Sequence, residues 1–144
     1  MSWSRRISRR RFLVVAAATV PAAAAALEPW RAIVAVRRDH SLAARLARLV
    51  AHRDSARVIG GEYLQMLGGG VDRLQLVAAL ASELPGGHRA AGAASAEELA
   101  ELVAGRVRQD FEDERTISLR GWIVSVTEAR LAAIAGTTPQ RPAA

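Results

Sequence analysis

The sequence predicts a mainly helical fold, a small domain of about five helices with one β-hairpin near its C-terminal end. Three observations indicate this fold class. Apolar residues recur at the three- and four-residue spacing of amphipathic helices through most of the chain. Two Ser-x-x-Glu sequences have the form of helix capping boxes. Near residue 116 the helical spacing gives way to two short β-rich runs around a two-residue turn.

Length and composition limit the domain further. A chain of 144 residues is enough for one small domain. The absence of cysteine excludes disulfides, thiolate iron–sulfur ligation, haem attachment through CxxCH and a cysteine nucleophile. Aromatic residues make up only 4% of the chain, so the core is expected to consist of Leu, Val, Ile and Ala.

The first two amphipathic helices are expected over residues 42–51 and 56–67. Ser41 is a plausible N-cap of the first, and Asp54 or Ser55 can cap the second. The apolar face of the second helix is expected to comprise Ile59, Tyr63, Met66 and Leu67.

Glycines interrupt and then end the second helix. Gly60 and Gly61 lie inside it, where each costs about 1 kcal/mol in helix propensity. They indicate either the close approach of another helix or a kink. Residues 68–70 are all glycine and are expected to end the helix in the left-handed conformation.

A third helix is expected over residues 71–84, followed by a Gly- and Ala-rich loop over 85–94. Ser95 and Glu98 form the first capping box and start the fourth helix. The apolar face of this fourth helix is expected to comprise Leu99, Leu102, Val103, Val107 and Phe111.

The hairpin is expected near residues 116–124, with Arg120 and Gly121 as its turn. Ser125 begins the second capping box, which leads into a short last helix. The helical domain thus spans residues 27–136, and a disordered tail is expected over 137–144.

Trp122 is the most informative single residue of the hairpin. One interpretation is that it packs in the core against the last two helices. The other is that it anchors a partner protein, because Trp is favoured at interface hot spots. An isolated two-stranded ribbon is not stable alone, so the hairpin must pack on helices or on another chain.

No residue pattern predicts catalysis or metal binding in this chain. The three histidines, His40, His52 and His88, lack a metal-ligand spacing such as HExxH. Asp110 begins an acidic run without the central Gly of a calcium loop, and it is expected to pair with Arg115 or Arg120. Neither a nucleophile with its base nor a GxGxxG nucleotide loop is present, so we expect a non-enzymatic protein without a cofactor of its own.

The first 26 residues have the features of an export leader. Ser8, the arginines of 9–11, Phe12 and Leu13 resemble the twin-arginine export signal, with Arg9 and Arg10 as the arginine pair. An apolar run then continues to residue 27, about the length of a signal core but short of the ~20 residues that span a bilayer. Ala24 and Ala26 form an A-x-A cleavage site, although an uncleaved leader that anchors the chain is the alternative.

The basic charge of the chain belongs mostly to this leader. All 20 basic residues are Arg, the formal net charge is +6, and residues 1–26 hold five Arg and no acid. The remainder has 15 Arg against 14 acidic residues, so nucleic acid is not an expected partner.

Two further stretches resemble known exported proteins. Residues 55–65, together with the leader, resemble the small subunits of exported flavin-dependent dehydrogenases for glucose, sorbitol and gluconate. Residues 110–131 resemble a pattern in small proteins that carry the twin-arginine signal. In the dehydrogenase families the large subunit binds FAD and performs the reaction, whereas the small subunit supplies the export signal and helps the large one to mature.

The resemblance implies a periplasmic accessory subunit that escorts a larger oxidoreductase through the twin-arginine translocation machinery. Trp122, Ile59 and Tyr63 are the expected partner-binding residues, and any FAD would belong to the partner. The alternative is a free-standing periplasmic or membrane-attached helical protein with an unrelated binding role.

Overall fold

The structure is a computed structural model that describes residue 35 and residues 37–137. The chain divides into two compact units, residues 1–37 and residues 38–144, and the architecture below is that of the second. The predicted leader, including its cleavage site, lies outside the described residues. No helix in the described ranges is both long and apolar enough to cross a bilayer.

The described residues form six helices and one two-stranded antiparallel sheet, which confirms the mainly helical fold class with a C-terminal hairpin. Helical backbone over 37–48 precedes the labelled elements. These elements are α2 (Arg53–Met66), α3 (Arg73–Glu83), α4 (Gly87–Ala93), α5 (Ala96–Glu112), β1 (Thr116–Leu119), β2 (Trp122–Ser125) and α6 (Val126–Gly136).

Both predicted capping boxes are present. The Ser95 hydroxyl accepts from the backbone N–H of Glu98, and the Glu98 carboxylate accepts from that of Ser95. Ser125 and Glu128 repeat this exchange at the start of α6. These reciprocal bonds satisfy backbone donors that a helix start would leave unpaired. A third capping box, between Asp72 and Gln75, begins α3 and was not predicted.

Two expected helix starts are wrong. Ser41 is not an N-cap, because it lies inside the helix of residues 37–48. The N-cap of α2 is His52, whose side chain makes no capping bond, rather than Asp54 or Ser55. Asp54 instead lies in the first turn of α2, where a negative charge is favourable beside the helix N-terminus.

The loop expected over residues 85–94 is also wrong, because residues 87–93 form α4. Gly86 is left-handed, with φ of 75°, which lets the chain turn directly from α3 into α4. The guanidinium of Arg45 donates to the carbonyl oxygens of Gly92, Ala94 and Ser95 at the end of α4. These bonds come from a helix far away in the sequence, so the local composition did not reveal them.

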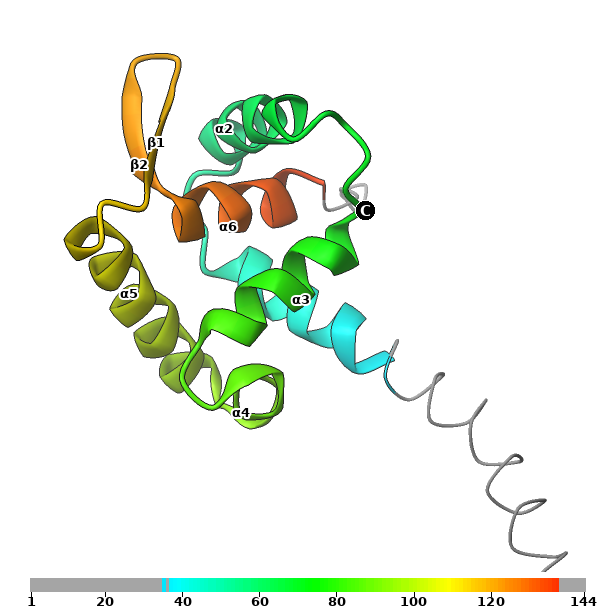
Figure 1. Cartoon of the computed structure of the whole chain (residues 1–144). Coiled ribbons are helices and arrows are strands. Elements are labelled where there is room, and N and C mark those ends of the chain that lie inside the picture. The colour runs from blue at the N-terminus through cyan, green and yellow to red at the C-terminus, as the bar shows by residue number, and fades with distance from the viewer. Residues whose placement is uncertain (1–34, 36, 138–144) are drawn as a thin grey trace, which may run out of the picture. The chain divides into compact units, whose positions relative to one another are not determined.

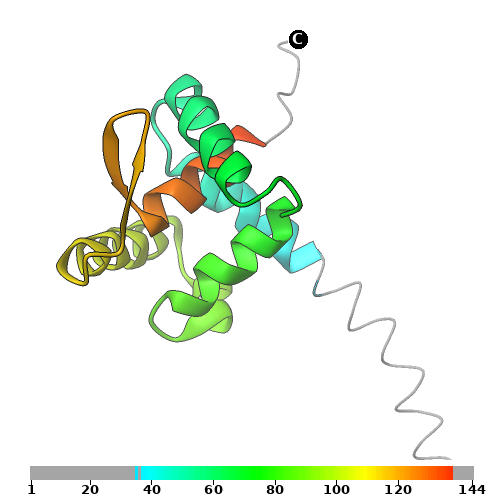
Figure 2. The same cartoon turned by 45° about the horizontal axis from the view of Figure 1, so that its top comes forward.

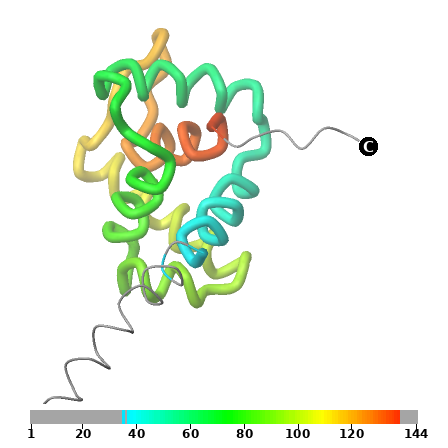
Figure 3. The backbone as a smooth tube through the Cα atoms, turned by 90° about the vertical axis from the view of Figure 1, so that its right-hand side faces the viewer, coloured from blue at the N-terminus to red at the C-terminus, as the bar shows by residue number. Residues whose placement is uncertain are grey.

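Helix α6 lies at the centre of this unit. Figure 1 shows it between α2 and α3, with the hairpin attached to its start. Figure 2 shows the hairpin and α5 at the same end of the unit. In Figure 3 the helix of residues 37–48 runs from α2 toward α4. The largest fully buried apolar side chains come from four of these helices: Leu42, Leu46, Val77, Leu80, Leu99 and Ile134.

Small residues let α2 approach α6 closely. The buried positions of α2 are Ala56, Gly60 and Tyr63, at helical spacing. A Cβ atom added to Gly60 would lie only 2.6 Å from the backbone of Ala133 in α6. Of the two interpretations of Gly60, the close approach of a second helix is therefore correct. By contrast, a Cβ atom added to Gly61 would have no neighbouring atom within 4 Å.

Three residues expected on apolar helix faces are exposed. Met66 is 54% and Phe111 46% exposed, each in the last turn of its helix, and Leu67, the C-cap of α2, is 41% exposed. The apolar face of α2 is turned toward α6 through its small residues, so it leaves Met66 outside. The predicted apolar face of α5 is buried at Leu99 and Val103, but Phe111 lies in the exposed last turn.

The hairpin has the predicted two-residue turn. Its strands pair from Thr116 with Ser125 to Leu119 with Trp122. Arg120 and Gly121 both have positive φ, 51° and 84°, as a type I′ turn requires. This turn matches the right-handed twist of the strands, so the hairpin projects as one continuous ribbon.

Replacement of Gly60 by Ala is expected to destabilise the domain by about 1–3 kcal/mol, because the backbone of α6 must move to admit the methyl group. Gly61→Ala is the matched control, and it is expected to be neutral or to stabilise by up to about 1 kcal/mol. Urea unfolding of both variants measures the difference. Equal stability of the two variants would contradict the close packing of α2 on α6.

Candidate functional site: a groove between α2 and the hairpin

An apolar groove of about 500 Å³ lies between α2 and the hairpin. Four apolar side chains line it, Val58 and Ile59 from α2 and Leu119 and Trp122 from the hairpin. Two of the four, Val58 at 49% and Trp122 at 70%, are exposed to solvent. Large apolar side chains that gather on one surface indicate a binding site more strongly than scattered ones do.

Trp122 owes its exposure to its position at the end of the ribbon. It pairs with Leu119, and paired residues of antiparallel strands lie on the same face of the sheet. Leu119 is only 6% exposed, whereas Trp122, directly opposite it in the pair that closes the turn, is 70% exposed. The interpretation of Trp122 as a core residue is therefore wrong.

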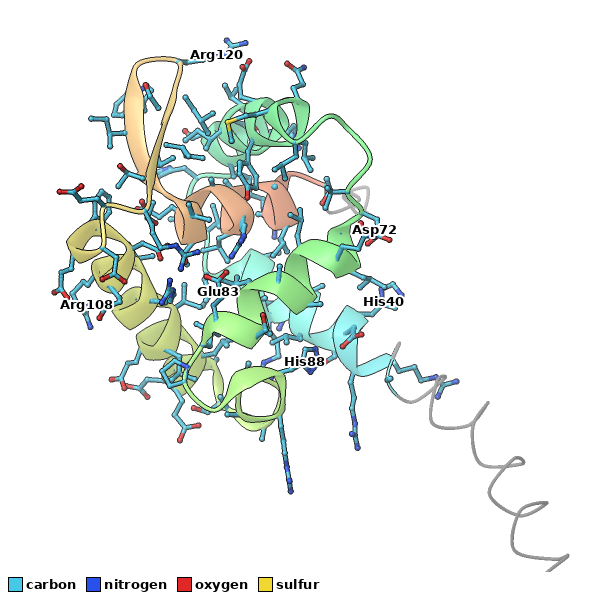
Figure 4. The ribbon with its side chains drawn as sticks, viewed as in Figure 1. His40, Asp72, Glu83, His88, Arg108 and Arg120 are labelled. Atoms are coloured by element: carbon cyan, nitrogen blue, oxygen red, sulfur yellow. The ribbon has the colours of Figure 1, made fainter. Side chains whose placement is uncertain are left out.

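The rim of the groove is polar and is held by ion pairs. Arg120 donates from Nε to Oε1 of Glu62 over 2.7 Å, which ties the hairpin tip to α2. Figure 4 shows Arg120 at this tip. At the other end of the groove Asp54 pairs with Arg57 over 3.0 Å. An apolar centre with a polar rim is the usual arrangement of a protein-binding surface.

The structure places the three predicted partner-binding residues differently. Trp122 and Ile59 both line the groove, with Ile59 half-buried. Tyr63 is only 5% exposed and belongs to the core, where its hydroxyl lies near Arg130. The structure thus brings two of the three to one surface. The predicted signal residues, Arg9, Arg10, Phe12, Leu13, Ala24 and Ala26, lie outside the described residues.

A network of five charged side chains holds the base of the hairpin against the helices. Its members, called the charge network below, are Glu83, Arg106, Asp110, Arg115 and Arg130. Glu83, at the end of α3, pairs with Arg130 over 2.7 Å and with Arg115 over 2.9 Å. Figure 4 shows Glu83 between α3, α5 and α6.

Asp110 is the buried member of the charge network. It is fully buried, and its Oδ1 lies 2.8 Å from Arg106 and 3.4 Å from Arg115. Its Oδ2 accepts from the backbone N–H of Thr127, in the first turn of α6, over 2.9 Å. The expected pairing with Arg115 is confirmed, but Arg120 pairs with Glu62 instead.

Opposing effects act on the Glu83 carboxyl. Burial raises its pKa, but hydrogen bonds and the positive charges of Arg130 and Arg115 outweigh burial and hold the pKa below its ordinary value. Glu83 is therefore ionised at neutral pH and compensates the guanidinium groups around it.

Among the residues that the structure describes, the groove is lined by carboxylates and one guanidinium but by no histidine. No three or more His, Asp or Glu side chains within residues 35 and 37–137 are grouped so that they could hold a metal ion. What the groove offers is apolar contact area and a polar rim, the features of a protein-binding surface.

Sequence reasoning missed Val58 and most of the charge network. Val58 could have been noticed, because it is an apolar residue on the face of α2 that is otherwise polar. The Arg106–Asp110 pair also has a signal, since the two residues are four positions apart on one helix. No local pattern connects either residue with Glu83. The arginine partners of Glu83 lie on α5, in the segment just before β1 and on α6.

No family model, curated protein or solved structure matches this chain.

Acid is expected to remove the contribution of Glu83 to stability. Because its pKa is lower in the folded chain, this contribution is complete above the ordinary pKa of about 4.5 and is lost as the pH falls through the lowered value. Glu83→Gln should therefore be less stable than the wild type at pH 7, with a gap that narrows below about pH 4.5. Unfolding by urea between pH 7 and pH 3 measures the gap, with Glu112→Gln as the exposed control. A gap that stays constant with pH would contradict the ion pairing.

Proposed function

We propose that this protein is a non-catalytic accessory subunit that binds a larger oxidoreductase and escorts it through the twin-arginine route to the periplasm. The observation that supports the proposal most is Trp122, 70% exposed beside an apolar groove. Burial of a large indole on a partner gains more binding free energy than burial of most other side chains.

The leader supplies the second part of the proposal. The Arg9–Arg10 pair resembles the signal of a route that carries proteins already folded. A partner bound at the groove before export would cross the membrane with this chain and would need no signal of its own. The resemblance of residues 55–65 to dehydrogenase small subunits favours a partner that binds FAD, and this segment includes Val58 and Ile59 of the groove.

Removal of the indole is expected to weaken partner binding. Trp122→Ser in the tagged full chain should weaken the complex by at least ~2 kcal/mol, or about 30-fold, because a buried anchor is lost. Phe111→Ser is the matched control, since Phe111 is also exposed, at 46%, but lies on α5 away from the groove lining. The partner is the flavin-containing protein that purifies with the wild type and with Phe111→Ser, and its binding to each variant is measured by titration. Equal loss in both variants, or in neither, would contradict docking at the groove.

Replacement of Arg9 and Arg10 by Lys tests the escort. The double variant is expected to retain both this chain and the partner in the cytoplasm, because the partner depends on the signal of this chain. With Trp122→Ser, only the partner should stay in the cytoplasm. The variant chain itself should still be exported, since it keeps its signal. Cell fractionation with detection of both proteins makes the measurement. If the partner reaches the periplasm while this chain stays behind, the escort function is wrong.

A further inference from the structure

A second cavity, of about 710 Å³, lies where α4 packs beside the helix of residues 37–48. Its polar lining consists of Arg38, Ser41, Arg45, His88 and Arg89, and no carboxylate from residues 37–137 lines it. Figure 4 shows His88 at this junction. The cavity is separate from the groove, with which it shares no lining residue.

One of its guanidinium groups is fixed by the fold. Arg45 donates to Gly92 over 3.1 Å, to Ser95 over 3.2 Å and to Ala94, all backbone carbonyl oxygens at the end of α4. These bonds hold α4 against the helix of residues 37–48. They also fix a positive charge in the wall of the cavity without neutralising it, because carbonyl oxygens carry no net charge.

Two further guanidinium groups lack a compensating carboxylate. Arg38 and Arg89 are exposed, and neither forms an ion pair with another residue in the described ranges. One lining residue, His88, does contact a carboxylate: its Nε2 lies 2.8 Å from Oδ1 of Asp39. By contrast, the arginines of the charge network and of the groove rim all have carboxylate partners.

We propose that this cavity, called the basic cavity below, binds an anion of the phosphate type. Guanidinium groups bind phosphate oxygens through two parallel hydrogen bonds, and Arg38 and Arg89 reach the cavity from two different helices. Arg45 adds a fixed charge, and the hydroxyl of Ser41 adds a neutral donor. The anion is either the phosphate of a lipid headgroup or a soluble phosphate, and the two sources share this chemistry. The proposal is independent of the groove and of its partner.

The test uses the purified full chain and a double variant, Arg38→Gln with Arg89→Gln. The matched control is Arg53→Gln with Arg108→Gln, which has the same net charge and changes two exposed arginines outside the basic cavity. Binding is measured to vesicles of phosphatidylglycerol and phosphatidylcholine, to vesicles of phosphatidylcholine alone, and to inorganic phosphate at constant ionic strength. Because both variants keep the leader, its own affinity for vesicles is the same in each.

A lipid headgroup predicts that the cavity variant binds the anionic vesicles less tightly than the control, by about 5-fold for each arginine removed. A soluble phosphate predicts saturable binding of inorganic phosphate to the wild type and the control, and its loss in the cavity variant. The exposed positions of both arginines predict a folded variant, which circular dichroism checks, and Arg89→Gln alone gives a second variant with one arginine removed. If the cavity variant and the control behave alike toward both vesicles and phosphate, the proposal is wrong.

Discussion

The contact of α2 with α6 at Gly60 fixes the geometry on which the proposed binding site depends. A hydrogen in place of a side chain brings the two helices together, since a Cβ atom would lie 2.6 Å from the Ala133 backbone. The hairpin continues directly into α6, so the distance of α2 from α6 also sets its distance from the hairpin. The apolar groove is the space that remains between α2 and the hairpin once that contact is made.

The opposite side of the hairpin is fixed by charge rather than by close packing. Asp110 accepts from the start of α6 and compensates Arg106 and Arg115, so one buried carboxylate joins α5, the base of the hairpin and α6. A buried carboxylate of this kind costs free energy to desolvate, and the cost is met only when its partners are in place. The arrangement therefore favours one orientation of the ribbon. Trp122 thus projects from a hairpin whose base is fixed, which would lower the entropy cost of the proposed partner binding.

Local patterns predicted much of the fold, because the signals that govern helices and turns act over a few residues. The capping boxes at Ser95 and Ser125 and the Arg120–Gly121 turn are of this kind. The start of α2 and the existence of α4 could not be predicted, since α4 is held by bonds from Arg45 that span almost fifty residues. The groove was foreseen in part. Residue type and helix position indicate Trp122 and Ile59, whereas Tyr63 is buried because the face of α2 toward α6 is set by Ala56 and Gly60.

The groove between α2 and the hairpin is the proposed binding site of a larger protein. Hydrogen exchange of the backbone amides, measured for the chain alone and in its purified complex with the partner, tests that claim most directly. Binding at the groove predicts slower exchange in the complex over residues 55–62 and 117–123, which carry the groove, with α4 and the first turns of α5 unchanged. A stable complex in which residues 55–62 and 117–123 exchange as fast as in the free chain would contradict it.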